Sequence, residues 1–179
     1  SHAIFAPGNW ICMSAAWIAL KIIHELGHGL VCKRYQGEVR EMGLVFVLLA
    51  PLAYVDVTSS WRFPSKWQRI HVAAAGIYVE LLVAAVAALA WSRTDTILLS
   101  HLLHSLIVMA SISTILFNAN PLMRFDGYYL LADFLEIPNL YSEGANWVRG
   151  MVGWLFLGVP RDTTRMLGIR GWLVALYGV

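Results

Sequence analysis

Three residues near the start of the chain, His24, Glu25 and His28, have the types and spacing of a metal-dependent hydrolytic site. Two histidines four residues apart lie on one face of an α-helix, so both imidazoles can bind one metal ion. The glutamate between them can accept a proton from a water bound to that metal. The surrounding segment, about residues 10–35, is long and largely apolar. Because ionisable groups are costly inside a membrane-spanning helix, we interpret this cluster as a functional site within the bilayer.

A hydrolytic zinc ion needs a third protein ligand and a position left open for water. The extension that supplies a third histidine in metzincins is missing, since Val31 and Arg34 occupy the required positions. The best candidate downstream is Asp126, which follows a proline break after the third apolar segment and precedes a glycine. If the first and third apolar segments both cross the membrane, Asp126 lies at about the same depth in the bilayer as the histidine pair. We therefore expect a single zinc ion bound by His24, His28 and Asp126.

Four other polar residues are candidates for supporting this site. Lys21 lies on the same helical stripe as the histidines, and Glu80 lies on a small-residue face of the second apolar segment. Glu80 could be protonated, or it could pair with Lys21 or another inward group. Asn118, beside Asn120 at the end of the third segment, could hold an extended substrate backbone or could cap the helix.

The elements that must position these residues are membrane helices. The chain has 179 residues, of which 59% are hydrophobic and 13% are charged, whereas a soluble domain has about 25% charged residues. Long apolar runs predict an α-helical polytopic membrane protein with spans at about 10–35, 69–91 and 97–117. The net charge of +2 gives no argument for a nucleic-acid partner.

The distribution of basic residues predicts the orientation of these spans. Six Lys and Arg residues lie between positions 33 and 69, and only Arg93 lies between the second and third spans. By the positive-inside rule the first loop is cytoplasmic and the second is exterior, which places the metal site toward the cytoplasm.

The segments between and after the spans are predicted separately. Residues 43–57 are apolar and β-prone but are split by Pro51, which predicts a short membrane-associated β-hairpin. Short or partial helices are expected at 129–135 and 146–159, and a truncated span from 172. We expect one membrane-embedded domain over 1–179, with its core at about 10–135, as a fragment of a longer protein.

Two motifs together resemble the site-2 protease family of intramembrane zinc metallopeptidases. They are His24-Glu25-x-x-His28 and Asn118-x-x-Pro121-x-x-x-x-Asp126-Gly127, separated by one span as a three-helix core of that family requires. The stretches 120–129 and 135–140 are similar to a bacterial subgroup described as peptide zinc metalloproteases. A departure occurs at Ile77 and Glu80, where many members of the family have proline and asparagine.

The resemblance implies a function and a role for each matching residue. His24, His28 and Asp126 are expected to bind zinc, Glu25 to act as general base, and Asn118 to position substrate. The substrate is expected to be a membrane-associated protein or peptide, in the cytoplasmic membrane of a bacterium. A secretion-adaptor-like module is an expected partner. The alternative function is a non-proteolytic component of a peptide export system that retains the fold.

Overall fold

The computed structural model describes residues 7–47, 50–158 and 169–178. The chain divides into two compact units, Ser1–Leu130 and Leu131–Val179.

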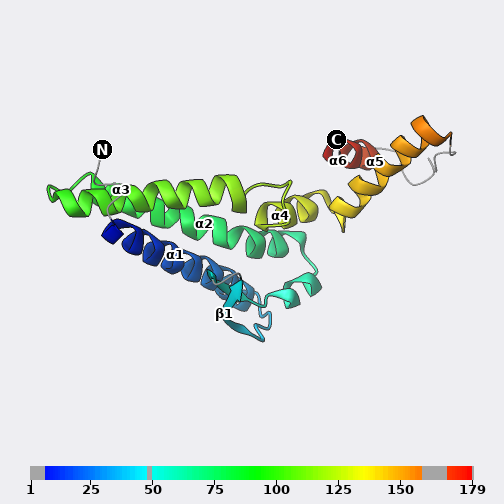
Figure 1. The fold of residues 1–179 in the computed structure, drawn as a ribbon. Helices are drawn as coiled ribbons and strands as arrows, with labels where there is room; N and C mark the ends of the chain where they lie inside the picture. The colour runs from blue at the N-terminus through cyan, green and yellow to red at the C-terminus, as the bar shows by residue number, and fades with distance from the viewer. Residues whose placement is uncertain (1–6, 48–49, 159–168, 179) are drawn as a thin grey trace. The chain divides into compact units, whose positions relative to one another are not determined.

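Three long helices form the first unit. They are α1 (Pro7–Arg34), α2 (Lys66–Trp91) and α3 (Ile97–Ile112), and α3 continues as the π-helical segment η3 (Ser113–Asn118). Helix α2 lies between α1 and α3 and packs against both (Figure 1). The three predicted helices are therefore confirmed. Among the described residues, two helices are long and apolar enough to cross a membrane, α2 and the continuous helix Ile97–Asn118.

Small residues set the spacing between α1 and α2. A side-chain carbon added at Gly27 would lie 3.0 Å from a methyl group of Val79 and 3.3 Å from the carbonyl oxygen of Ala75. The two backbones can therefore approach closely at this level, as small residues permit in membrane helix pairs. This close approach brings the face of α2 that carries Gly76 and Glu80 against the histidine face of α1.

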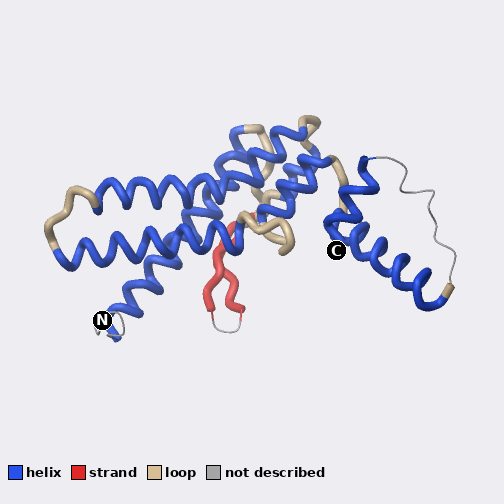
Figure 2. The backbone as a smooth tube through the Cα atoms, turned by 90° about the horizontal axis from the view of Figure 1, so that it is seen from above, coloured by secondary structure: helices blue, strands red, loops and turns tan. Residues whose placement is uncertain are grey.

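The predicted hairpin is confirmed. Strands β1 (Met42–Val47) and β2 (Ala50–Val55) form an antiparallel hairpin (Figure 2). Leu44 lies opposite Ala53 in its register. Residues 48 and 49, at the turn of the predicted segment, lie outside the described residues.

The register determines which backbone groups of β2 face β1. The N–H of Asp56 donates to the carbonyl of Glu41 at 2.8 Å, just beyond the paired residues. Because the direction alternates along a strand, the N–H groups of Val55 and Ala53 point away from β1. Pro51 belongs to the same outward set, so its missing N–H removes no hydrogen bond from the hairpin. This explains how a proline is accommodated within the strand.

The segment after the hairpin contains a 3₁₀ helix, η2 (Thr58–Arg62), within the predicted loop. The Asp56 carboxylate accepts hydrogen bonds from the hydroxyl and the backbone N–H of Thr58, and these bonds lower the pKa of Asp56 below its usual value. Asp56 therefore stabilises the turn that leads into η2.

Helix α4 (Asp126–Leu135) begins three residues before the predicted start at 129, so Asp126 lies in its first turn. Gly127 allows this start, because a side-chain carbon at that position would collide with the backbone of Ala119. The chain after η3 thus folds back tightly before α4.

The second unit contains α5 (Leu140–Leu157) and α6 (Ile169–Gly178), which pack against each other. The predicted helix at 146–159 begins six residues earlier, because Asn139 adopts a left-handed conformation that starts the new helix at Leu140. Its predicted end at 159 lies outside the described residues. The segment predicted from 172 is helical from Ile169.

Candidate metal centre

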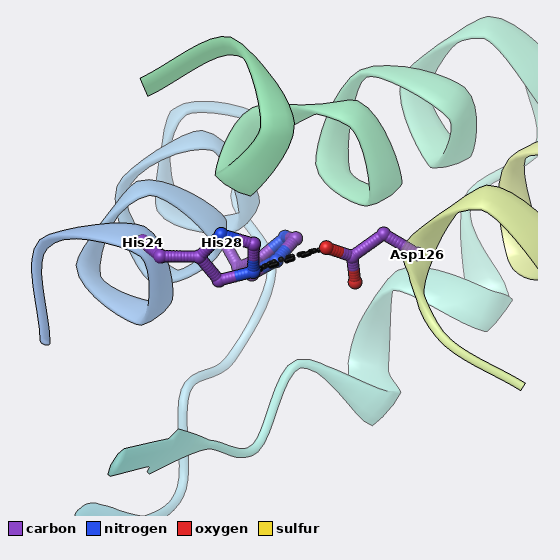
Figure 3. Close-up of side chains that lie close together, drawn as sticks. All are labelled: His24, His28 and Asp126. Atoms are coloured by element: carbon purple, nitrogen blue, oxygen red, sulfur yellow. Dashed lines mark hydrogen bonds and ion pairs between the residues drawn. The ribbon is translucent and has the colours of Figure 1, made fainter. Parts of the chain in front are cut away.

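Helix α1 presents His24 and His28 on the face that packs against α2. Both are buried, with 4% and 6% of their surface exposed. Their rings meet edge to face, and their Nε2 atoms are 3.1 Å apart. Both imidazoles point toward the side chain of Asp126, which comes from the start of α4 (Figure 3). The four-residue spacing thus places two nitrogen ligands side by side.

The carboxylate of Asp126 completes a triangle of potential ligand atoms. Its Oδ2 lies 3.0 Å from Nε2 of His24 and 3.4 Å from Nε2 of His28. In a tetrahedral zinc site with bonds near 2 Å, neighbouring ligand atoms are about 3.3 Å apart. These three side chains are the only such cluster of metal-ligand type found among the described residues. The triangle has dimensions that suit one zinc ion.

Two further observations favour a cation at this position. Asp126 Oδ2 is buried and receives no well-aligned hydrogen bond, which is costly for an anionic oxygen unless a cation compensates it. Gly76 of α2 lies directly against the imidazoles, since a side-chain carbon there would collide with both His24 and His28. The absence of a side chain therefore leaves the space beside the Nε2 atoms open.

The hydrogen bonds on the far side of each ring orient the nitrogen ligands. Nδ1 of His28 lies 2.7 Å from the carbonyl oxygen of Val72. A carbonyl can only accept, so Nδ1 carries the proton and the neutral ring presents a lone pair at Nε2. Nδ1 of His24 lies 3.2 Å from Oε1 of Glu80, which has the same consequence. This arrangement of an acceptor behind each histidine is typical of metal sites.

Glu25 lies next to the histidines and lines the same cleft. The outward N–H of Val55 in β2 donates a hydrogen bond to its carboxylate. The hairpin thus contacts Glu25, whose side chain lines the same cleft as the ligand triangle.

Lys21, Glu80 and Asn118 form a buried polar network with η3. Lys21 Nζ donates to Oε1 of Glu80 and to the hydroxyl of Ser113, both at 2.7 Å. Asn118 donates to Oε2 of Glu80 at 2.8 Å, and Thr114 donates to the same oxygen at 2.6 Å. Of the pairings considered for Glu80, the structure contains the ion pair with Lys21.

Asn120 makes different contacts. Its side chain accepts from the N–H of Leu122 at 2.9 Å and donates to the carbonyl of Leu116 at 3.3 Å. These bonds shape the loop between η3 and α4, which carries Asp126.

Sequence reasoning missed Ser113 and the Val72 carbonyl. In an α-helix Ser113 and Asn118, five residues apart, would differ in direction by about 140°. The π-helical bond from the N–H of Ala119 to the carbonyl of Thr114 places residues five apart on one face instead. A period of 3.6 could not reveal this, and a backbone acceptor such as Val72 leaves no signal in residue type.

A cleft of about 1510 Å³ leads to the site between α1 and α3. The candidate site residues His24, Glu25, Asn118 and Asp126 line this cleft, and so does Ala53 of β2. Most of the remaining lining is apolar. A cleft of this size exceeds what a small ligand needs.

The two buried histidines and the half-buried Asp126 form a cluster of metal-ligand type among helices, with the carboxylate of Glu25 lining the same cleft. The model of peptidase family M50, the site-2 protease family, matches residues 13–95. The chain is similar to this family over those residues, and the members of the family are intramembrane metallopeptidases. The match includes both histidines, Glu25 and Glu80, whereas Asn118 and Asp126 lie beyond it. No solved structure matches the chain.

Proposed function

We propose that this chain forms the catalytic core of an intramembrane zinc endopeptidase that cleaves membrane-associated proteins or peptides. The observation that carries the proposal is the triangle of His24, His28 and Asp126, whose ligand atoms are 3.0–3.4 Å apart. The donor set of two imidazoles and one carboxylate suits zinc in hydrolytic sites.

When bound there, zinc would act as a Lewis acid on the peptide carbonyl and would acidify water. Glu25 would accept the proton from the attacking water and deliver it to the leaving amine. Its hydrogen bond to the Val55 N–H would keep the carboxylate directed at the reacting centre. The acceptors at Nδ1 of His24 and His28 would fix the tautomer, so that the Nε2 lone pair of each ring is directed at the metal.

Strand β2 is suited to hold the substrate in an extended form. A helical peptide hides its carbonyl groups in internal hydrogen bonds, so a scissile segment must unwind. Ala53 lines the same cleft as the site and is on the outward edge of β2, with its N–H and carbonyl directed away from β1. A substrate strand can add to this edge, and Asn118 at the same end of the cleft would hydrogen-bond near the cut.

The charge pattern supports a cytoplasmic location of the loop 33–69, and the membrane we propose is the cytoplasmic membrane of a bacterium. Single cysteines at Ser60 and Thr94 in intact cells, treated with an impermeant thiol reagent, test this orientation. We expect labelling at Thr94 alone. Labelling at Ser60 alone would invert the proposed topology.

The proposed activity is tested with purified protein in lipid vesicles and synthetic single-span peptides carrying a central glycine pair. We expect cleavage that stops after treatment with a zinc chelator and returns when zinc is added. Stoichiometric zinc without cleavage of any peptide, or of co-purified membrane proteins, would favour a non-proteolytic role in peptide export. Cleavage unaffected by complete zinc removal would contradict the proposal.

A further inference from the structure

We infer that Glu80 is a positioning residue that orients the ligand His24 and the substrate-contacting Asn118 together, with Lys21 as its counter-charge. This inference rests on the proposed function, because it concerns how the same site is held. Its test is a zinc affinity, which does not depend on finding a substrate.

Glu80 is fully buried, with 0% of its surface exposed, and four donors surround its carboxylate. Oε1 faces the ammonium group of Lys21 at 2.7 Å and Nδ1 of His24 at 3.2 Å. Oε2 accepts from Thr114 and Asn118. Both oxygens of the side chain are therefore used, each by two donors.

A carboxylate satisfies this arrangement without any change in its partners. A carboxylate is an acceptor at both ends, whereas the amide of glutamine has one acceptor oxygen and one NH₂ donor. Glutamine at this position would set its NH₂ group against either the pair on Oε1 or the pair on Oε2. A glutamine that kept its oxygen toward Lys21 and His24 would force Thr114 and the Asn118 amide to turn and accept, and it would lack the charge opposite Lys21.

Lys21 makes this buried charge tolerable. An unpaired carboxylate in a buried position is strongly destabilising, and an ion pair with further hydrogen bonds compensates much of that cost. The second bond from Lys21 to Ser113 anchors the ammonium group on η3. One carboxylate thus links α1, α2 and η3, the three elements that carry His24, Glu80 and Asn118.

The 3.4 Å contact between Asn118 Nδ2 and His24 Nδ1 supports the same inference. Both atoms face Glu80 and both donate to it, so they do not need each other as partners. The metal ligand and the substrate contact are therefore held on opposite oxygens of a single side chain. A shift of Glu80 would disturb both functions at once.

The experiment measures zinc affinity by competition with a chelating indicator, and thermal stability in parallel. The variants are Glu80→Gln, Lys21→Met and the double variant, with the exposed Glu38→Gln as the matched control. We expect Glu80→Gln to bind zinc roughly 10–100-fold more weakly, the usual effect of removing a group that orients a ligand. Glu38→Gln should retain the wild-type affinity.

The double variant separates positioning from simple charge compensation. Lys21→Met alone should lower thermal stability, because it leaves a buried carboxylate unpaired. Lys21→Met with Glu80→Gln should recover stability but should still bind zinc at least roughly tenfold more weakly than wild type. Recovery of wild-type zinc affinity in the double variant would overturn the inference, as would wild-type affinity in Glu80→Gln.

A conservative variant covers the case in which Glu80→Gln does not fold. Glu80→Asp keeps the charge but shortens the side chain. The flexible Lys21 side chain can follow the withdrawn carboxylate, whereas the packed ring of His24 cannot, so zinc affinity should fall while the fold is retained. Wild-type affinity in Glu80→Asp would also overturn the inference. Failure of the wild-type protein to bind stoichiometric zinc would contradict the proposed function instead.

Discussion

Helices α1 and α2 are nearly equal in length, with 28 and 26 residues, but they contribute to the site in opposite ways. Helix α1 provides reactive groups, the two histidines and Glu25. Helix α2 provides mostly space and backbone, through Gly76, the carbonyl of Val72 and one carboxylate. The candidate site therefore depends on the missing side chain at Gly76 of α2 as much as on the candidate ligands of α1.

The largest expected effect on cleavage comes from a change in helix α1, which provides the reactive groups. Glu25→Gln should reduce cleavage by roughly 10²- to 10⁴-fold, the usual contribution of a general base, because glutamine cannot accept the proton. Zinc content should remain at the wild-type level, as measured by metal analysis of the purified variant. Cleavage at the wild-type rate would show that Glu25 is not the general base. Loss of zinc from the variant would instead show that Glu25 stabilises metal binding.

The facing helix is tested by Gly76→Ala. The new methyl group would occupy the space against both imidazoles, so we expect zinc affinity to fall at least roughly tenfold, as for other groups around metal ligands. A competition titration with a chelating indicator measures this change.

Gly150→Ala in α5 is the matched control, because its side-chain carbon would meet nothing within 4 Å. It should leave zinc affinity unchanged and stabilise the helix by up to about 1 kcal/mol. Equal zinc affinity in both alanine variants would show that a methyl group fits between α2 and the imidazoles. The space provided by Gly76 would then not be needed for zinc binding.

The backbone of the hairpin is tested by comparing its two edges, one on β2 and the other on β1. Ala53→Pro removes an outward N–H beside the site, and Leu44→Pro removes one from the opposite edge of the hairpin. We expect the first variant to raise the KM for peptide roughly tenfold, since it loses a substrate hydrogen bond and admits a bulky ring. The second variant should have a nearly unchanged KM.

Equal effects of these two prolines would argue against substrate pairing at β2. Val47 is not a suitable position for this test, although it lies in the hairpin. Its N–H faces β2 in the observed register, so a proline there would disrupt the hairpin itself.

The smallest expected effect is that of Asn118→Ala. Removal of one hydrogen bond near the cut should reduce kcat/KM about 3- to 10-fold, while zinc remains bound. Glu80 retains its other three donors in this variant. Full activity in Asn118→Ala would leave the amide with a structural role only.

Much of the fold follows from the sequence, because hydrophobic length and β-propensity are local signals. The three long helices and the hairpin have the predicted order, and Pro51 lies at a position where the ladder needs no donor. The predicted starts of α4 and α5 lie three and six residues too late. Those boundaries depend on the fold-back at Gly127 and on the left-handed Asn139, which are tertiary and conformational features.

The site is predictable to the extent that it consists of reactive side chains at helical spacing. His24 and His28 lie together as expected, and Asp126 reaches them from about a hundred residues away. Ser113 could not be predicted, because the π-helical bond at Thr114 changes which residues share a face. The contact of Gly76 with the two imidazoles could not be predicted either. A pattern of small residues indicates close packing of helices but does not identify the atoms that are packed.

The central claim is that Asp126 binds one zinc ion together with the two histidines. The most direct measurement is the zinc content of purified wild-type protein and Asp126→Ala, by elemental analysis after exhaustive buffer exchange. The account predicts about one zinc per chain in the wild type, as for a single three-ligand site, and a large loss in the variant, with the helical content unchanged. Equal, full zinc occupancy in both proteins would contradict it.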